Sequence, residues 1–311
     1  MNPEVRRAAQ ILRAGGLVAF PTETVYGLGA DAASAVAVAR LYAAKGRPAD
    51  HPVIVHFAGA ERAFEWAREV PAAARQLAAK FWPGPLTMIL KRSARAKDFV
   101  TGGQDGVGLR VPSHPVAQAL LREFGAGVAA PSANLFGTVS PTTAAHVRQD
   151  LQGKVDLVLE GGASEVGIES TIIDLSAAKP VLLRPGKVSA QEIESILQQR
   201  VSLRTADAPR HSGGLARHYA PRTRMRLVPA HQLDAEIAKR AASVAVLAFS
   251  RPDERVDYWI RMPRQPQAYA QRLYAALREL DGAGCETMLI EAPPDTPEWT
   301  AVTDRLSRAA G

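Results

Sequence analysis

The stretch LVAFPTETVYGLGADAASAVAVARLYAAKGRPADHPVIV, residues 17–55, decides the fold. It opens with the apolar run Leu17–Phe20, which predicts a buried strand. Pro21 cannot donate a hydrogen bond to a sheet, so pairing should stop there and a polar loop, residues 21–24, should follow. A second buried strand is predicted at Val53–Phe57. Two strands so close in sequence, joined by a helix-length segment, indicate an α/β fold.

The segment between these strands predicts turns and one helix. Gly27 and Gly29 predict backbone turns that bulkier residues resist. Ser34 predicts the start of a helix and Gly46 its end. Ligands of α/β proteins usually bind where strands end, and this stretch brings polar side chains to such loops. They are two hydroxyls, a carboxylate, two cations and two imidazoles: Thr22, Thr24, Glu23, Lys45, Arg47, His51 and His56.

Length and composition set the class of protein. The chain has 311 residues, enough for two domains, and its 47% hydrophobic and 22% charged residues are typical of a globular protein. No apolar run reaches the length of a membrane span, and charged residues interrupt the N-terminus where a signal peptide would be apolar. The single cysteine, Cys285, excludes a disulfide framework and predicts a buried thiol in a reduced, cytoplasmic protein.

The pattern of elements divides the chain at a linker. Residues 201–224 lack periodicity and contain several glycines and prolines, which predicts a linker. Beyond it, strands at 225–228, 244–249 and 287–290 alternate with helices near 233–240, 267–280 and 298–309, which predicts a small parallel α/β domain. The predicted elements before the linker include helices at 60–70, 72–82, 114–124 and from about 140 to 148, and strands at 86–91, 108–111, 128–130, 155–160, 170–175 and 181–184.

Several common sites are excluded by spacing. The chain has no G-x-x-x-x-G-K-[ST] phosphate loop and no G-x-S-x-G nucleophile elbow. Residues 27–32 fit G-x-G-x-x-A, but they lie too far from the strand for the first glycine to make the tight turn of a dinucleotide site. His51 and His56 lack the partners that a histidine-ligated metal requires.

The positive signals are a basic charge and hydroxyl residues at strand ends. The net charge of +7 favours anionic partners, and six arginines with a single acid, Asp207, lie between Arg200 and Arg224. Arg110 and Arg184 lie in predicted strands, where an arginine faces either a cavity or solvent. Together with Lys45 and Arg47 they favour a site for a polyanion and a carboxylate. The residues alone thus predict an α/β enzyme that holds a phosphorylated ligand without a P-loop.

Several ordered motifs identify a family resemblance. They are PTETVYGLG at 21–29, KGRPADHPVIVH at 45–56, GLRVPSHP at 108–115, APSAN at 130–134, SPT at 140–142, GIESTIID at 167–174 and LLRPG at 182–186. This set resembles the YrdC-like threonylcarbamoyl-AMP synthase family, and HYAP at 218–221 followed by a small α/β domain resembles its long, two-domain form. The resemblance implies a YrdC-like catalytic domain at 1–200, a linker or lid at 201–224 and a Rossmann-like parallel domain at 225–311. In the first domain, helices would surround a twisted mixed sheet and a central cavity.

The resemblance also implies a reaction. L-threonine, bicarbonate and ATP would give threonylcarbamoyl-AMP and pyrophosphate, the first step in forming threonylcarbamoyl-adenosine at position 37 of tRNAs that read ANN codons. Mg²⁺ would accompany ATP through the phosphates, with no protein-held metal site. A tRNA threonylcarbamoyl transferase complex would take the product.

Residue roles follow from the same resemblance, position by position, with no covalent nucleophile. The threonine site would comprise Thr24, His56, Arg110, Ser170 and the backbone of Ala130, with Arg110 binding the carboxylate. The ATP site would comprise Lys45, Arg47, His51, Ser132, Ser140, Arg184 and, from the linker, Tyr219. His51 stands where the family also has asparagine.

Two alternatives belong to other classes. An RNA- or ribosome-binding protein of the same fold would explain the basic charge, and weak RNA contact is compatible with either function. Aromatic residues, however, form only 6% of the chain and do not cluster among the linker arginines. A carbamoyl-transfer maturation enzyme with a YrdC-like domain would require zinc-binding cysteines, which one cysteine excludes.

Overall fold

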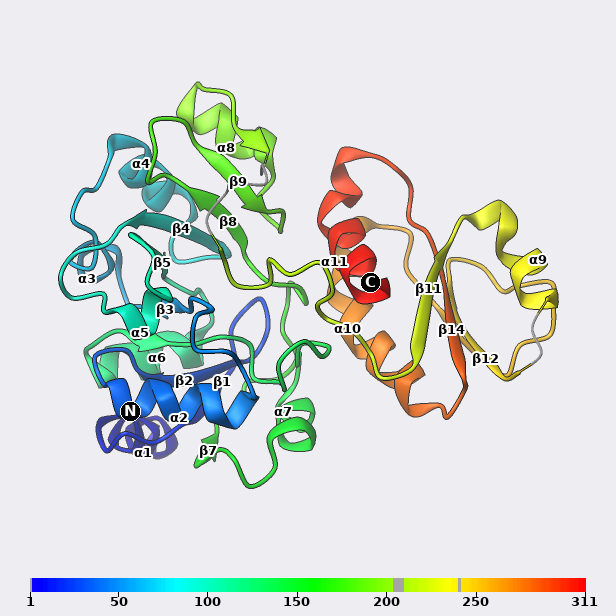
Figure 1. The fold of residues 1–311 in the computed structure, drawn as a ribbon, viewed down its shortest axis with the longest axis horizontal. Coiled ribbons are helices and arrows are strands. Elements are labelled where there is room, and N and C mark those ends of the chain that lie inside the picture. The colour runs from blue at the N-terminus through cyan, green and yellow to red at the C-terminus, as the bar shows by residue number, and fades with distance from the viewer. Residues whose placement is uncertain (1, 204–209, 240–241) are drawn as a thin grey trace. The chain divides into compact units, whose positions relative to one another are not determined.

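The computed structural model describes residues 2–203, 210–239 and 242–311, which form two compact units (Figure 1). The first unit draws on residues up to 136, 141–165 and 169–214. The second draws on 137–140, 166–168 and 215–311. The linker predicted at 201–224 therefore contributes residues to both units, and residues 204–209 lie outside the described part. The domain boundaries at 200 and 224 stay predictions.

The first unit is built on one mixed sheet of ten strands in the order β10-β9-β8-β4-β5-β3-β6-β2-β1-β7. Parallel and antiparallel pairs alternate irregularly along it, as expected for a chain that crosses the sheet many times. The strands are β1 Val18–Phe20, β2 Gly27–Asp31, β3 Ile54–His56, β4 Leu86–Lys91, β5 Gly106–Arg110, β6 Val128–Ala129, β7 Leu157–Val158, β8 Thr171–Asp174, β9 Val181–Arg184 and β10 Ser202–Leu203.

Helices cover the sheet because its strands are apolar on both faces. In β1, Val18 and Phe20 pack with the helices α1 and α6, whereas Ala19 points to the other face and packs with α2 and α7. Ser34 caps α2, and Gly46 ends it in the left-handed conformation, as predicted. The helices are α1 Pro3–Arg13, α2 Ala35–Lys45, α3 Ala60–Phe64, α4 Ala72–Phe81, α5 Asp98–Thr101, α6 Pro115–Phe124, α7 Ala144–Leu151 and α8 Ala190–Leu197.

The prediction of turns at Gly27 and Gly29 was wrong, because both residues lie in strand β2. This strand pairs antiparallel with β1, with Gly27 opposite Phe20 and Gly29 opposite Val18. A Cβ on Gly29 would lie 2.9 Å from the ring of Phe20 and 2.9 Å from a methyl of Val128. Glycine is therefore required here by close packing within the sheet and not by a turn.

Four further predictions needed correction. The helix predicted at 60–70 ends at Phe64, because the chain then bridges to Arg92 at Ala67. The strand predicted at 155–160 is limited to Leu157–Val158, and the helix predicted from 140 begins only at Ala144, after the Thr143 cap. Cys285 is half-buried, not buried.

The second unit is the predicted small parallel α/β domain. Its four strands are all parallel, in the order β11-β14-β12-β13, and α10 and α11 cover one face while α9 covers the other (Figure 1). The edge strand β13 was not predicted; it has only four residues, and three of them are at least partly exposed. The elements are β11 Arg224–Val228, α9 Leu233–Ala238, β12 Val244–Ala248, β13 Tyr258–Arg261, α10 Pro266–Gly282, β14 Thr287–Glu291 and α11 Thr300–Ala310, with 3₁₀ turns at Ala230–Gln232 and Pro297–Trp299.

Among the described residues, no helix is both long and apolar enough to cross a membrane.

Candidate active site

Strand register places three predicted site residues in one row across the sheet of the first unit. His56 on β3 is opposite Arg110 on β5, and Ile172 on β8 is opposite Arg184 on β9. Thr87 on β4 lies opposite Ile172 and joins the two pairs. Side chains at matched positions of neighbouring strands point to the same face. Hence one face of the sheet presents an imidazole, two guanidinium groups and a hydroxyl in a row across neighbouring strands.

Arg110 is held by a buried ion pair with Glu23. Its Nη2 donates to Glu23 Oε1 over 2.7 Å, and each side chain is only 5% exposed. The other carboxylate oxygen of Glu23 accepts the backbone N–H of Ser113 over 3.1 Å. The Glu23 carboxylate was expected in this loop but was not predicted to have a role in binding. Its position in the loop that leaves β1, inside the motif PTETVYGLG, was the available signal.

His56 is kept neutral by its surroundings. Burial, with the nearby charge of Arg110, lowers the pKa of its imidazole to about 3. Its Nδ1 has no hydrogen-bond partner among the described residues, and the ring meets Phe20 edge-on at 6.2 Å between centroids. Buried polar atoms normally have partners, so an enclosed nitrogen without one is unusual.

The other residues predicted for the threonine site lie around the same row. Ser170 Oγ shares a hydrogen bond of 2.8 Å with Thr87 Oγ1, and Arg184 donates to the Ser170 carbonyl and hydroxyl over 3.0 and 3.2 Å. Thr24 is fully buried, and its hydroxyl lies 2.8 Å from that of Thr22. The N–H of Ala130 donates to the Ile54 carbonyl, so a ligand contact by Ala130 would fall to its carbonyl oxygen.

Arg184, predicted for the ATP site, thus contacts Ser170, predicted for the threonine site. It is 3% exposed, and its third contact is a 2.8 Å hydrogen bond from Nη1 to the carbonyl of Ser212. The guanidinium thus links the strand row to the segment that follows residue 209.

Lys45 and Ser132 form a second group with the loop that leaves β6. The ammonium of Lys45, at the C-terminal end of α2, donates to the carbonyls of Ser132 and Asn134. Its side chain is buried, and burial, with the neighbouring charge of Arg47, holds its pKa well below the usual value. A nearby anionic ligand would favour the charged form of this lysine.

Arg47 and His51 meet at the ring of Phe136. The guanidinium of Arg47 lies 5.5 Å from the ring centroid, and the imidazole of His51 packs edge-on against the ring at 5.4 Å. Arg47 also donates to the Pro52 carbonyl over 2.8 Å. Burial and the charge of Arg47 lower the pKa of His51. Phe136, which gives this group an apolar wall, was not predicted.

Ser140 and Tyr219 belong to the second unit, whereas the other ten predicted residues belong to the first. Ser140 is buried, and its carbonyl accepts a hydrogen bond from Arg278. Tyr219 is 1% exposed, with a left-handed backbone at φ +61°, and its ring packs against His218 and Tyr274 and beneath the guanidinium of Arg305. A contact of Tyr219 with a nucleotide stays a prediction.

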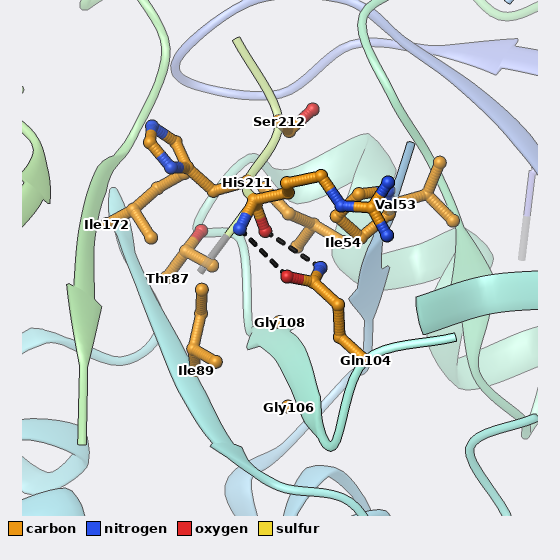
Figure 2. A pocket seen from close by; sticks show the side chains of 12 residues that line it. Val53, Ile54, Thr87, Ile89, Gln104, Gly106, Gly108, Ile172, His211 and Ser212 are labelled. Atoms are coloured by element: carbon orange, nitrogen blue, oxygen red, sulfur yellow. Dashed lines mark hydrogen bonds between the residues drawn. The ribbon is translucent and has the colours of Figure 1, made fainter. Parts of the chain in front are cut away.

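A small cavity of about 30 Å³ lies on the row's face of the sheet (Figure 2). Gly106 and Gly108 leave room in its floor beside Ile54, Ile89 and Thr87. Residues 210–212, here called the strap, form part of its wall. Neither Gln104 nor His211 was predicted to line the site. The full lining is Pro52, Val53, Ile54, Thr87, Ile89, Gln104, Gly106, Gly108, Ile172, Arg210, His211 and Ser212.

Lys45, Arg47, Arg110 and Arg184 give the site cationic groups that suit anionic ligands. Among the described residues, no three histidine, cysteine, aspartate or glutamate side chains converge in a way that could hold a metal ion. The Glu23 carboxylate is already paired with Arg110.

Comparison with known proteins identifies the family. The model described as Telomere recombination, which covers Sua5, YciO and YrdC proteins, matches residues 10–186, and the model described as Threonylcarbamoyl-AMP synthase, C-terminal domain, matches residues 188–311. Threonylcarbamoyl-AMP synthase of Pyrococcus abyssi is 39% identical over 99% of this chain and 94% of its own length. Threonylcarbamoyl-AMP synthase of Bacillus subtilis is 39% identical over 100% of this chain and 94% of its own length.

A solved structure agrees over both units. The crystal structure of P. abyssi Sua5 complexed with L-threonine superposes with a TM-score of 0.92 at 38% identity, covering 99% of this chain and 94% of that one. The two family models together span the fold from α1 to α11, including the parallel domain. The chain therefore belongs to the YrdC-like threonylcarbamoyl-AMP synthase family, in its long, two-domain form.

Proposed function

We propose that this chain is an L-threonylcarbamoyladenylate synthase, which converts L-threonine, bicarbonate and ATP into threonylcarbamoyl-AMP and pyrophosphate. The observation that carries the proposal is its similarity over nearly the whole length, at 39% identity, to proteins named threonylcarbamoyl-AMP synthase. The complex of P. abyssi Sua5 with L-threonine supports threonine as the amino acid. The alternative, an RNA-binding protein of the same fold, has no such support.

The row on the sheet provides the groups that threonine requires. Arg110 is rigidly placed by Glu23 and would bind the α-carboxylate through charge-assisted hydrogen bonds. The neutral imidazole of His56 and the hydroxyl of Ser170 would orient the polar groups of the substrate. A neutral histidine does not repel the substrate's ammonium group, which must lose a proton before it reacts.

The chemistry needs positioning more than a protein nucleophile. The threonine amine forms a C–N bond with the carbon of bicarbonate, and water leaves as the carbamate forms. A carbamate oxygen then attacks the α-phosphorus of ATP, and pyrophosphate departs as the P–O bond to the β-phosphate breaks. Lys45, Arg47 and Arg184 would neutralise the charge that gathers on the phosphates during this step.

Magnesium would accompany ATP and supply charge neutralisation at the phosphates when bound. The residues present fit this arrangement, since Lys45 and Arg47 would bind phosphate oxygens and, in the described part of the chain, no carboxylate cluster competes for the ion. The product would pass to a tRNA threonylcarbamoyl transferase complex, because a mixed anhydride of this kind hydrolyses readily in water.

The test is pyrophosphate release by the purified full-length chain with ATP, bicarbonate and magnesium. L-threonine is compared with L-serine and with no amino acid, and the nucleotide product is identified by mass. Release that requires threonine, with formation of threonylcarbamoyl-AMP, is the expected result. If the folded protein releases no pyrophosphate with threonine but binds RNA, the RNA-binding alternative holds instead.

A further inference from the structure

Within the first unit, two hydrogen bonds join the backbone of the strap, residues 210–212, to the side chain of Gln104. The amide nitrogen of Gln104 donates to the Arg210 carbonyl over 2.9 Å, and the Arg210 N–H donates to the Gln104 Oε1 over 2.8 Å (Figure 2). A carboxamide has a donor and an acceptor side by side, so it can bond both the N–H and the C=O of one residue. Gln104 thus binds the strap much as a neighbouring strand would.

The side chain of Arg210 adds two contacts to the same loops. Its guanidinium donates to the Gly102 carbonyl over 2.9 Å and pairs with Asp50 over 3.0 Å. The ion pair is exposed, at 53% and 61% for the two side chains, so it adds little. The loops that carry Gly102 and Asp50 pack closely, because a Cβ on Gly102 would lie 2.2 Å from the Asp50 carbonyl oxygen.

The far end of the strap is attached to the row on the sheet. Arg184 donates to the carbonyl of Ser212 and to Ser170, so the strap's end is connected to the predicted substrate groups. Between the two attachments, His211 is 5% exposed and lines the cavity together with Ile54 and Ile172. The strap therefore lines the cavity between one attachment to Gln104 and another to Arg184.

We propose that Gln104 is a positioning residue for the reaction: by binding the backbone of Arg210, its carboxamide seats residues 210–212 over the cavity next to Arg184. The inference rests on the proposed function for the reaction it serves, but the attachment itself is independent of that function. Gln104 touches no substrate in this role. It acts through the strap, which excludes water from the labile product and fixes the carbonyl that Arg184 binds.

The main experiment replaces Gln104 in the full-length chain. Gln104→Met keeps the length of the side chain and removes both hydrogen bonds. The control, Asp105→Asn, alters the adjacent residue of the same loop, whose carboxylate pairs with the exposed Arg68 and not with the strap. Gln104→Glu is the intermediate variant, since it keeps an acceptor for the Arg210 N–H and loses the donor.

The first readout is hydrogen–deuterium exchange of the peptide that covers residues 210–214. Two lost hydrogen bonds should speed its exchange by about ten- to a hundredfold in Gln104→Met, less in Gln104→Glu and not in Asp105→Asn. Unchanged exchange in Gln104→Met would overturn the attachment. Should that variant fail to fold, Gln104→Glu and Arg210→Ala, which removes only the side-chain contacts, would provide the same comparison.

The second readout separates positioning from structure. In Gln104→Met we expect kcat for threonylcarbamoyl-AMP to fall about tenfold, KM for threonine and ATP to change by less than about threefold, and more AMP to form per product. Faster exchange with unaltered kcat would overturn the role in the reaction. If the native chain shows no threonine-dependent activity, the proposed function fails, while the exchange measurement still decides whether Gln104 holds the strap.

Discussion

Glu23 and Arg110 form an ion pair of 2.7 Å between side chains that are each only 5% exposed. Removing one of these side chains would leave the other charge buried without its counterion, which costs far more free energy than removing both. The guanidinium is therefore both a structural member of the first unit and the group predicted to bind the substrate carboxylate. These two roles can be separated by experiment.

Arg110→Ala should lower the free energy of unfolding by about 3–5 kcal/mol and weaken threonine binding much more than ATP binding. The double variant Glu23→Gln with Arg110→Ala should regain most of that stability, because no unpaired charge remains, without regaining threonine affinity. Urea denaturation gives the stabilities, and calorimetric titration gives the two affinities. Equal losses of threonine and ATP binding would contradict the role of Arg110.

Lys45 should make ATP binding depend on pH. Its folded-state pKa lies below the usual value because of burial and Arg47, whereas phosphates favour the charged ammonium. Above the folded-state pKa, ATP binding should take up a proton, so the dissociation constant should rise by up to about tenfold per pH unit. Titration calorimetry in buffers of different ionisation enthalpy counts the proton. Lys45→Arg, whose guanidinium stays charged, should bind ATP without taking up a proton.

His56 should destabilise the protein in acid. The imidazole has a pKa of about 3 when folded and about 6.5 when unfolded, so the unfolded chain binds the extra proton. The contribution of the neutral imidazole to the free energy of unfolding is present above pH 6.5. It is lost as the pH falls toward 3, at up to about 1.4 kcal/mol per pH unit. Between pH 6.5 and 5 the native chain should lose about 2 kcal/mol more than His56→Asn. Identical pH slopes for the two proteins would show that His56 is not neutral when folded.

Gly29→Ala tests the packing of β2 on β1. Its new methyl would meet the Phe20 ring and Val128 at 2.9 Å, and this overpacking should cost about 1–3 kcal/mol. Gly59→Ala is the matched control, because a Cβ there meets nothing within 4 Å and the backbone is extended; it should cost less than about 1 kcal/mol. Thermal or urea unfolding measures both. If Gly29→Ala leaves the free energy of unfolding unchanged, the neighbouring side chains can move aside at this point of the sheet.

Much of the architecture could be predicted from the chain. Apolar runs predicted the strands at 17–20, 53–57 and 86–91, and the cap at Ser34 and stop at Gly46 predicted the helix between the first two strands, because these signals act within a few residues. The parallel second domain was predicted for the same reason. Gly27 and Gly29 were misinterpreted, since a glycine needed for close packing and one needed for a turn are identical in sequence.

The sequence by itself determined the family, the two-part organisation and the identity of the chemical groups, because ordered motifs and local propensities are carried by neighbouring residues. Only the tertiary structure decided which of those groups meet. Strand register placed His56, Arg110 and Arg184 in one row, burial paired Glu23 with Arg110, and a contact 106 residues apart joined Gln104 to Arg210. Such pairings depend on how strands cross a sheet and which charges lose water, and no local pattern of residues records either.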